Sequence, residues 1–339
     1  MEFDIISPKK EALNEFVIKS KYSTFFQTGY MLDIYSDVPG CETIPLAAVK
    51  DDKIIASLVG VKFTERDGIF KHFSTHSTIR GGPIWIDNET GKKAAISLIQ
   101  EYNRITKNDS LYDKIYPIHD NGLPEVLQQY KCEQEGFLNF LVNLSRSEEE
   151  IWNSMNKKRR YGVRKAEKNN LKIKEIENED EVKIFYELLK ETSENASISI
   201  KNYKLFSNVF DILVPKGISK IYLASHNGTY IGGMLTLNYK DIIYDWYACS
   251  SRKHLHLYPN DYLVWHVLSW GSENGYSFFD FGGAGNPDKP YGVRDFKKEF
   301  GGDLVNYGTY TLVNKPLMLN LVTKMYGIYK EKTASRKKS

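Results

Sequence analysis

The sequence contains little cysteine, and its three cysteines, Cys41, Cys132 and Cys249, are widely spaced. An odd number without any CxxC pair argues against a disulfide framework and favours a reducing compartment. No stretch approaches the roughly 18 apolar residues that a membrane-spanning helix needs, and the N-terminus lacks a basic segment followed by an apolar run. We therefore expect a cytoplasmic protein, and we leave open a peripheral contact with the inner face of the membrane.

Several common catalytic signatures are also missing. The chain has no HExxH, no Gly-x-Ser-x-Gly and no P-loop, which argues against zinc peptidases, serine hydrolases and P-loop nucleotide hydrolases. His72 with His76, or His254 with His256, could share a strand face, but no nearby carboxylate or cysteine completes a metal site. We expect no metal and no bound cofactor. The net charge of +3 is too small to argue for nucleic acid by itself, and we expect no DNA partner.

The length of 339 residues favours two globular domains. We place the first at residues 1–145, completed by about 304–330, and the second at 146–303, with a disordered basic tail at 331–339. The boundary lies in the SRSEEE segment, where a predicted strand at 137–144 passes into a new helix. Apolar spacing predicts helices at 8–20, 91–107, 147–169, 179–191, 202–213, 259–274 and 317–329.

Two segments look like copies of one hairpin. Aligned without gaps at an offset of 177, Leu46 to Val61 matches Leu223 to Asn238 at four positions, and each copy reaches a tight polar turn. A third strand is expected after each hairpin, at 70–77 and at 242–249. Because helices precede and follow both copies, we interpret the chain as an internal duplication. The expected fold is mixed α/β, with two similar domains and a cleft between them.

The stretch from Asp280 to Gly302 reads DFGGAGNPDKPYGVRDFKKEFGG and follows an apolar, strand-like run. Its glycines and prolines shape tight backbone, and loops that cost this much entropy often hold chemistry. The loop opens into the basic segment Arg294-Asp295-Phe296-Lys297-Lys298. The alternative interpretation is an ordinary strand-to-helix turn with a solvated helix start.

The predicted helix around residues 151–170 carries a dense group of basic side chains: Lys157, Lys158, Arg159, Arg160, Arg164, Lys165 and Lys168. Four of them, Lys157, Arg160, Arg164 and Lys168, are spaced to fall on one stripe, where like charges repel by a few tenths of a kcal/mol per pair. A polyanion would neutralise this stripe. The alternative is a solvated helix face.

Two N-terminal motifs complete the pattern. Residues 79–85 read IRGGPIW, and residues 25–30 read FFQTGY. Together with the glycine-rich stretch and the KRRYGVRKA run at 158–166, they resemble motifs of the FemABX-type aminoacyl and peptidyl transferases of the GNAT superfamily. Tyr30 stands where that family usually has tryptophan. No helical-arm insertion is visible, so the chain resembles the shorter, armless FemX-like form.

The resemblance implies two tandem GNAT-like domains and transfer of an amino acid from aminoacyl-tRNA to an amine of a cell-wall or envelope precursor, lipid- or nucleotide-linked. The acyl donor is then a co-substrate. The resemblance places Lys297 and Phe296 at the catalytic centre, where Lys297 would stabilise a tetrahedral oxyanion or hold the acceptor end of the tRNA. The other implied roles are as follows: Arg294, Lys298 and Arg164 hold phosphates, Asp280 and Tyr247 orient the amine, Arg80 and Tyr30 bind substrate, and Lys157, Arg160 and Lys168 contact a polyanion.

Two other functions remain open. One is an N-acyltransferase that takes its acyl group from acyl-CoA or an acyl-carrier protein and modifies an amino sugar of a surface polysaccharide. The segment from Ser251 to Asn260 lacks the glycines that would cradle a CoA pyrophosphate, which counts against CoA but not against a carrier protein. The other is a binding module without catalysis.

Overall fold

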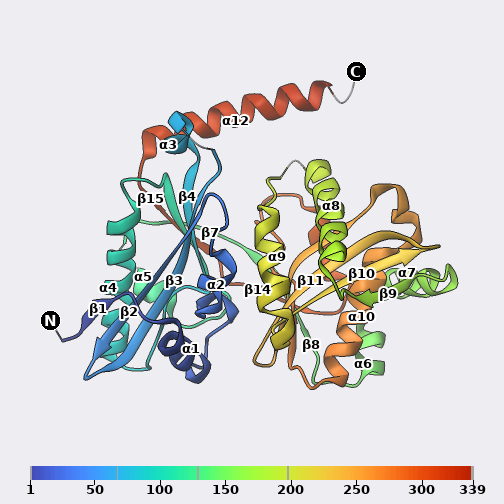
Figure 1. The fold of residues 1–339 in the computed structure, drawn as a ribbon, viewed down its shortest axis with the longest axis horizontal. Coiled ribbons are helices and arrows are strands. Elements are labelled where there is room, and N and C mark those ends of the chain that lie inside the picture. The colour runs from blue at the N-terminus through green and yellow to red at the C-terminus, as the bar shows by residue number, and fades with distance from the viewer. Residues whose placement is uncertain (1, 67, 128–129, 197, 337–339) are drawn as a thin grey trace. The chain divides into compact units, whose positions relative to one another are not determined.

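The computed structural model describes residues 2–66, 68–127, 130–196 and 198–336. It divides into two compact units (Figure 1). The first unit contains residues 1–135 and 307–339, and the second contains residues 136–306. The first unit is therefore assembled from both ends of the chain.

The first unit contains a mixed sheet whose strands follow the order β1-β2-β3-β4-β6-β15-β7, with β5 paired to β3. The strands are β1 (Asp4–Ile6), β2 (Cys41–Lys50), β3 (Lys53–Thr64), β4 (Thr75–Arg80), β5 (Ile84–Trp85), β6 (Tyr112–Tyr116), β7 (Glu133–Glu135) and β15 (Thr309–Val313). The helices are α1 (Lys10–Lys19), η1 (Phe25–Gln27), α2 (Tyr30–Tyr35), η2 (Gly68–Phe70), α3 (Lys71–Ser74), α4 (Glu89–Thr106), α5 (Leu123–Leu127) and α12 (Pro316–Arg336).

The second unit contains a sheet of order β14-β8-β13-β12-β11-β10-β9. Its strands are β8 (Leu138–Asn143), β9 (Lys172–Glu175), β10 (Ser219–His226), β11 (Thr229–Tyr239), β12 (Ile242–Ser250), β13 (Phe278–Asp280) and β14 (Asp303–Asn306). Its helices are α6 (Glu148–Ser154), α7 (Lys157–Lys168), α8 (Glu179–Ala196), α9 (Tyr203–Ile212), η3 (Val214–Lys216), η4 (Arg252–Leu257), α10 (Pro259–Glu273) and α11 (Gly292–Lys298).

The two sheets share one plan. Each contains a parallel pair, β4 with β6 and β12 with β13, and an antiparallel hairpin beside it. A helix, α4 or α10, connects the two parallel strands, as a parallel crossover requires. The prediction of a mixed α/β protein is confirmed.

The hairpins predicted as copies are β2–β3 and β10–β11, which occupy matching places in the two sheets. Their turns, Asp51-Asp52 and Asn227-Gly228, have positive φ throughout, as two-residue hairpin turns prefer. Both contain a bulge at matching positions, after Ala48 and after Ala224. These features align at an offset of 176, so the predicted offset of 177 is wrong by one residue. In a strand such a slip would exchange the two faces.

The correct offset also matches the cores of the two hairpins. Leu46, Ala48 and Leu58 in the first core correspond to Tyr222, Ala224 and Met234 in the second. The four identities found by alignment therefore join residues that point to opposite faces. Both faces of a buried strand have a similar apolar composition, which explains why the alignment was displaced by one residue.

Two predicted strands are corrected. The strand expected at 304–313 is two strands, of which β14 pairs in the second sheet and β15 in the first. The strand expected to end the first domain is β8, which pairs with β13 and β14 of the second sheet. Local patterning identifies a strand but not its partners, because strand propensity depends on the surrounding sheet.

Three helical segments also differ from expectation. Residues 70–74, expected in a strand, belong to η2 and α3. The helix expected at 147–169 is interrupted after Ser154, because Asn156 starts α7 by accepting a hydrogen bond from Lys158 N at 2.9 Å. Residues 331–336, expected to be disordered, continue α12, where Lys, Glu and Ala favour propagation; residues 337–339 lie outside the described part. Among the described residues, no helix is long and apolar enough to cross a membrane.

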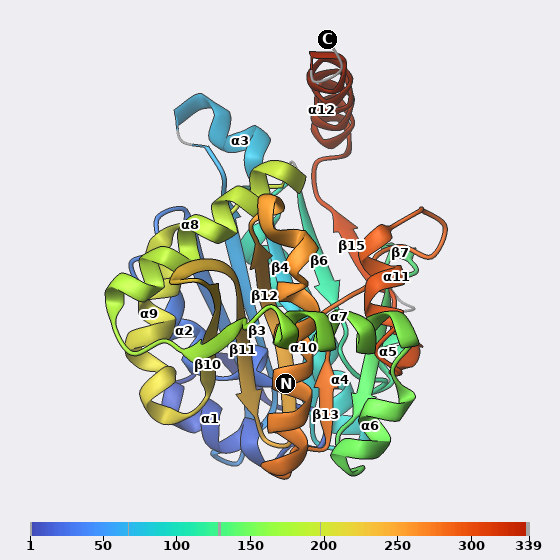
Figure 2. The same ribbon diagram turned by 90° about the vertical axis from the view of Figure 1, so that its right-hand side faces the viewer.

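The second sheet is covered on both faces. On one face α10 packs over Met234 and Phe279, and α7 packs across α10 (Figure 2). On the other face lie α8 and α9, whose Phe185 and Phe206 are in ring contact. The first of these faces carries α11 as well, because Phe296 and Phe300 join the same core.

Candidate functional site

The parallel strands β12 and β13 pair over a short stretch and then part. Residues 242–244 pair with residues 278–280, after which β12 continues beside β11 while the chain leaves β13 through Phe281. We call residues 281–291 the glycine-rich loop. The helix α11, which follows this loop, carries Lys297 back to the point where the strands part.

Lys297 is held by the start of the glycine-rich loop. Its ammonium donates hydrogen bonds to the carbonyl oxygens of Phe281 at 2.6 Å and Gly283 at 2.7 Å. Burial lowers the pKa of Lys297, whereas the carboxylates of Asp245 and Asp280 act to raise it. Burial also raises the pKa of Asp245 to about 6, against the opposing effect of Lys297. Lysine and two aspartates thus share one poorly solvated place.

Asp280 holds the glycine-rich loop in shape. Its carboxylate accepts hydrogen bonds from Asn139 Nδ2 at 2.6 Å and from the backbone N–H of Gly282 at 2.7 Å. Asn139 Oδ1 in turn accepts the backbone N–H of Gly283 at 3.0 Å. The side chain expected to orient an amine is therefore engaged in fixing the backbone carbonyls that bind Lys297.

Arg294 also serves the loop. Its guanidinium donates to the carbonyl oxygens of Ala284 at 2.9 Å and Lys289 at 3.0 Å, and further to those of Asn286 and Pro287. Such multiple bonding suits the planar fork of an arginine. Arg294, which we expected to hold phosphate, is therefore engaged with the carbonyl oxygens of the loop.

Phe296 is part of a buried charge cluster that sequence reasoning missed. Arg159 of α7 is 7% exposed and lies over the Phe296 ring at 4.8 Å. Its guanidinium forms ion pairs with Asp261 at 3.0 Å and Glu299 at 2.8 Å, although Arg159 Nε and both paired carboxylate oxygens lack hydrogen-bond alignment. Burial raises the pKa of Asp261 to about 6, while Arg159 acts to lower it. This cluster joins α7, α10 and α11.

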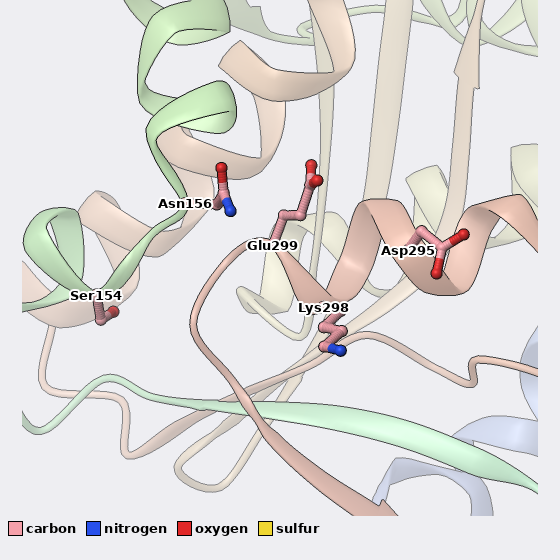
Figure 3. A pocket seen from close by; sticks show the side chains of 5 residues that line it. All are labelled: Ser154, Asn156, Asp295, Lys298 and Glu299. Atoms are coloured by element: carbon pink, nitrogen blue, oxygen red, sulfur yellow. The ribbon is translucent and has the colours of Figure 1, made fainter.

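A cavity of about 480 Å³ opens beside this cluster. Figure 3 shows Ser154 and Asn156 on the side of α6 and α7, and Asp295, Lys298 and Glu299 on the side of α11. The two sides are tied together where Asn156 N donates to Glu299 O at 2.8 Å. Lys298 is exposed and lines the cavity, whereas its neighbour Lys297 points into the loop.

The predicted stripe on α7 is at the surface. Lys157, Arg164 and Lys168 are exposed, and Arg160 is half-buried. Arg164 stacks over the Trp152 ring at 5.3 Å, and Arg160 donates to Asn153 at 3.4 Å. Within the described ranges none of the four forms an ion pair with a carboxylate, so their charges remain available to an anion.

Tyr247 belongs to different surroundings. It follows a bulge in β12 at Trp246, opposite Leu235 and Thr236, and its ring packs against Phe206 of α9 at 5.0 Å. It therefore packs on the α8–α9 face, whereas Phe296 of α11 packs on the α10 face.

In the first unit the two N-terminal motifs come together. Arg80 lies over the rings of Phe26 at 5.6 Å and Tyr116 at 5.3 Å. Gln27 is fully buried and donates from Nε2 to Gly82 O at 3.2 Å. Tyr30 stacks on Phe25 with the ring centroids 6.5 Å apart. Aromatic rings therefore position an arginine beside a glycine turn, an arrangement suited to an anionic or planar ligand.

Comparisons with known proteins agree on one family. The sequence model of the FemAB family matches residues 126–230 and 224–326. The lipid II:glycine glycyltransferase of Staphylococcus haemolyticus is 22% identical over 302 residues, covering 64% of this chain and 72% of that protein. That of Staphylococcus epidermidis (strain ATCC 12228) is 21% identical over 254 residues, covering 56% of this chain and 61% of that protein.

Solved structures show the same fold. FemX superposes with a TM-score of 0.70 at 17% identity, covering 94% of this chain and 100% of that chain. A tandem GNAT protein from the clavulanic acid biosynthesis pathway superposes with a TM-score of 0.56 at 9% identity, covering 92% and 99%. The predicted tandem GNAT-like fold is confirmed by these likenesses.

Proposed function

This chain belongs to the FemAB family, and we propose that it is an aminoacyltransferase that moves an amino acid from aminoacyl-tRNA to an amine of a cell-wall precursor. The staphylococcal relatives, which transfer glycine to lipid II by name, support an acyltransferase that acts on such a precursor. We further propose that the donor is an aminoacyl-tRNA and that the accepting group is an amine. A lipid-linked acceptor would bring the reaction to the inner face of the membrane.

The observation that carries the proposal is the position of Lys297. An ammonium has three N–H donors, and among the described residues two of them bind the carbonyls of Phe281 and Gly283. The third can donate to the oxygen of an acyl group placed where β12 and β13 part. Attack by the neutral amine forms the new C–N bond, the C–O bond to the tRNA ribose then breaks, and the proton that the amine loses ends on the ribose oxygen. Lys297 would stabilise the oxyanion between these steps.

The exposed stripe on α7 supports a polyanionic donor. Lys157, Arg160, Arg164 and Lys168 are spaced along one side of the helix, and phosphate contacts from such residues give most of the affinity for nucleic acid. Arg164, already stacked on Trp152, is partly pre-organised for such a contact. We therefore assign the acceptor end of the tRNA to the neighbourhood of α7 and α11.

The N-termini of α4 and α10, which occupy equivalent places in the two units, argue against acyl-CoA as the donor. A CoA pyrophosphate is held by free backbone N–H groups at a helix N-terminus. In α10 the first residue is Pro259, which has no N–H, and Asp261 adds a negative charge to the first turn. In α4 the Asn88 side chain already accepts the N–H of Gly91 at 2.8 Å. An acyl-carrier protein stays as the alternative donor.

The first unit supplies the proposed acceptor site. Arg80, between Phe26 and Tyr116, would bind a phosphate or carboxylate of the acceptor, and Tyr30 would line the same region. This assignment predicts that Arg80→Ala raises KM for the acceptor with little change in kcat, because it removes binding that does not change in the transition state.

Mass spectrometry of the acceptor tests the function. Purified protein is incubated with a lipid-linked or a soluble muramyl-peptide acceptor together with one donor at a time: charged tRNA, uncharged tRNA, acyl-CoA or a loaded acyl-carrier protein. We expect a mass gain of one aminoacyl residue with charged tRNA alone. A gain with acyl-CoA or acyl-carrier protein and none with any charged tRNA would replace the proposal by the alternative.

A further inference from the structure

Exposed apolar side chains gather on α12 and on the adjoining segment of η2 and α3. On α12, Leu317 is 87% exposed and Met325 is 61% exposed, with Leu321 between them on the same helix face. Phe70 and Phe73 are exposed on the adjoining segment. The helices α3 and α12 are in contact, and Figure 1 shows α12 projecting from the first unit beside α3. We call these five side chains the apolar patch.

The apolar patch is too concentrated to be ordinary surface. Single exposed apolar residues are common in soluble proteins, whereas a contiguous group marks a place of interaction. Two phenylalanines and three long aliphatic side chains on neighbouring helices form such a group. It contains no residue that we assign to donor, acceptor or catalysis.

Unpaired cations accompany the patch. Arg66, Lys71 and Lys324 are exposed, and in the part of the chain that the structure describes none of them forms an ion pair. The sequence of α12 contains Glu331 as its one acidic residue, against Lys324, Lys330, Lys332 and Arg336. Exposed apolar side chains bordered by cations, with few acidic residues among them, are suited to contact with anionic lipid headgroups.

We propose that the apolar patch binds an anionic lipid surface, with Leu317, Leu321 and Met325 inserted below the headgroups and the cations paired with lipid phosphates. A second copy of this chain is a poorer occupant, because symmetric association would bring the same cations together. Lipid binding by the patch would hold the enzyme where a lipid-linked acceptor lies, and this role rests on the proposed function. Lipid binding itself is measured without turnover.

Vesicle sedimentation tests the proposal. The full chain is mixed with vesicles of phosphatidylcholine alone or with added phosphatidylglycerol. We expect binding to the anionic vesicles that weakens with salt, and a loss of at least about tenfold in partitioning for Leu317→Glu/Leu321→Glu. Lys71→Glu/Lys324→Glu should lower partitioning to anionic vesicles alone. The matched control is Ile18→Glu, an exposed isoleucine on α1, which should bind as the wild type does.

The possible outcomes separate lipid binding from the other occupants of the patch. Absence of binding to anionic vesicles, or equal loss in the Ile18→Glu control, overturns the proposal. A dimer in light scattering that Leu321→Glu dissociates, without vesicle binding, assigns the patch to protein association and likewise overturns it. If the protein fails to bind vesicles while a soluble acceptor is still modified, the proposed function stands and the lipid inference falls. If the protein binds vesicles but transfers nothing to any acceptor, the lipid inference stands and the proposed function falls.

Discussion

Gly162 of α7 lies directly against Asp261 of α10, and a β-carbon added to Gly162 would come within 2.4 Å of Asp261 Oδ1. This close approach lets Arg159, one turn earlier on α7, reach Asp261 at 3.0 Å. A glycine inside a helix costs about 1 kcal/mol relative to alanine. Close packing of α7 on α10 is the physical reason for accepting that cost in the middle of the basic helix.

We expect Gly162→Ala to lower the free energy of unfolding by about 1–2 kcal/mol, because overpacking a buried contact outweighs the gain in helix propensity. Urea unfolding followed by circular dichroism measures the change. Gly327→Ala is the matched control, since an added β-carbon there meets no atom within 4 Å. Equal or greater stability of Gly162→Ala would show that α7 can move away from α10 without cost.

Lys297→Ala should lower kcat by about a hundredfold to a thousandfold, the usual effect of removing one oxyanion donor. Lys298→Ala, which changes the neighbouring side chain in the cavity of Figure 3, should mainly raise KM for the donor. Single-turnover kinetics with the active donor separates the two effects. Full turnover by Lys297→Ala would reduce the glycine-rich loop to a structural turn.

Many of the candidate residues in each unit are visible in the sequence because their motifs are local. The loop, its basic helix and the two N-terminal motifs are continuous strings, and the structure brings FFQTGY and IRGGPIW together around Gln27 and Arg80. The catalytic assignment of Lys297 and Phe296 stays a prediction. A sequence motif does not show which polar groups a side chain contacts in the fold. The hydrogen bonds from Arg294 to four loop carbonyl oxygens could therefore not be predicted.

Two missed residues left signals in the sequence. Asp245 interrupts the otherwise apolar strand IIYDWYAC, and a charge inside a buried strand needs a partner. Arg159 shares the helical spacing of Val163 and Ala166, which marks the apolar face of α7 and not its basic stripe. Asn139 left no such signal, because its contact with Asp280 joins strands that are far apart in the chain. The pairing of β8 with β13 and β14 was not predicted, because these strands too are far apart in the chain.

The pH profile of turnover should depend on Asp245. Its carboxylate acts to raise the pKa of Lys297, which burial lowers. Removing that charge in Asp245→Asn should lower the pKa of Lys297 further, so the loss of activity at rising pH should begin at lower pH than in the wild type. Measuring kcat/KM across the neutral and alkaline range tests this. Asp303→Asn, at an exposed position on β14, is the control. An unchanged alkaline limb in Asp245→Asn would separate Asp245 from the function of Lys297.

Binding of the charged donor should depend on salt through the stripe on α7. Each phosphate contact contributes a slope of about 0.7–0.9 to the dependence of the logarithm of affinity on the logarithm of salt concentration. We expect Arg164→Ala and Lys168→Ala each to flatten the plot by about that amount, since both side chains are exposed and without carboxylate partners among the described residues. Filter binding at several salt concentrations gives the slopes. Lys216→Ala, an exposed lysine in η3, should leave the slope unchanged. If the wild-type affinity is the same at low and moderate salt, α7 is a solvated face and the donor phosphates bind elsewhere.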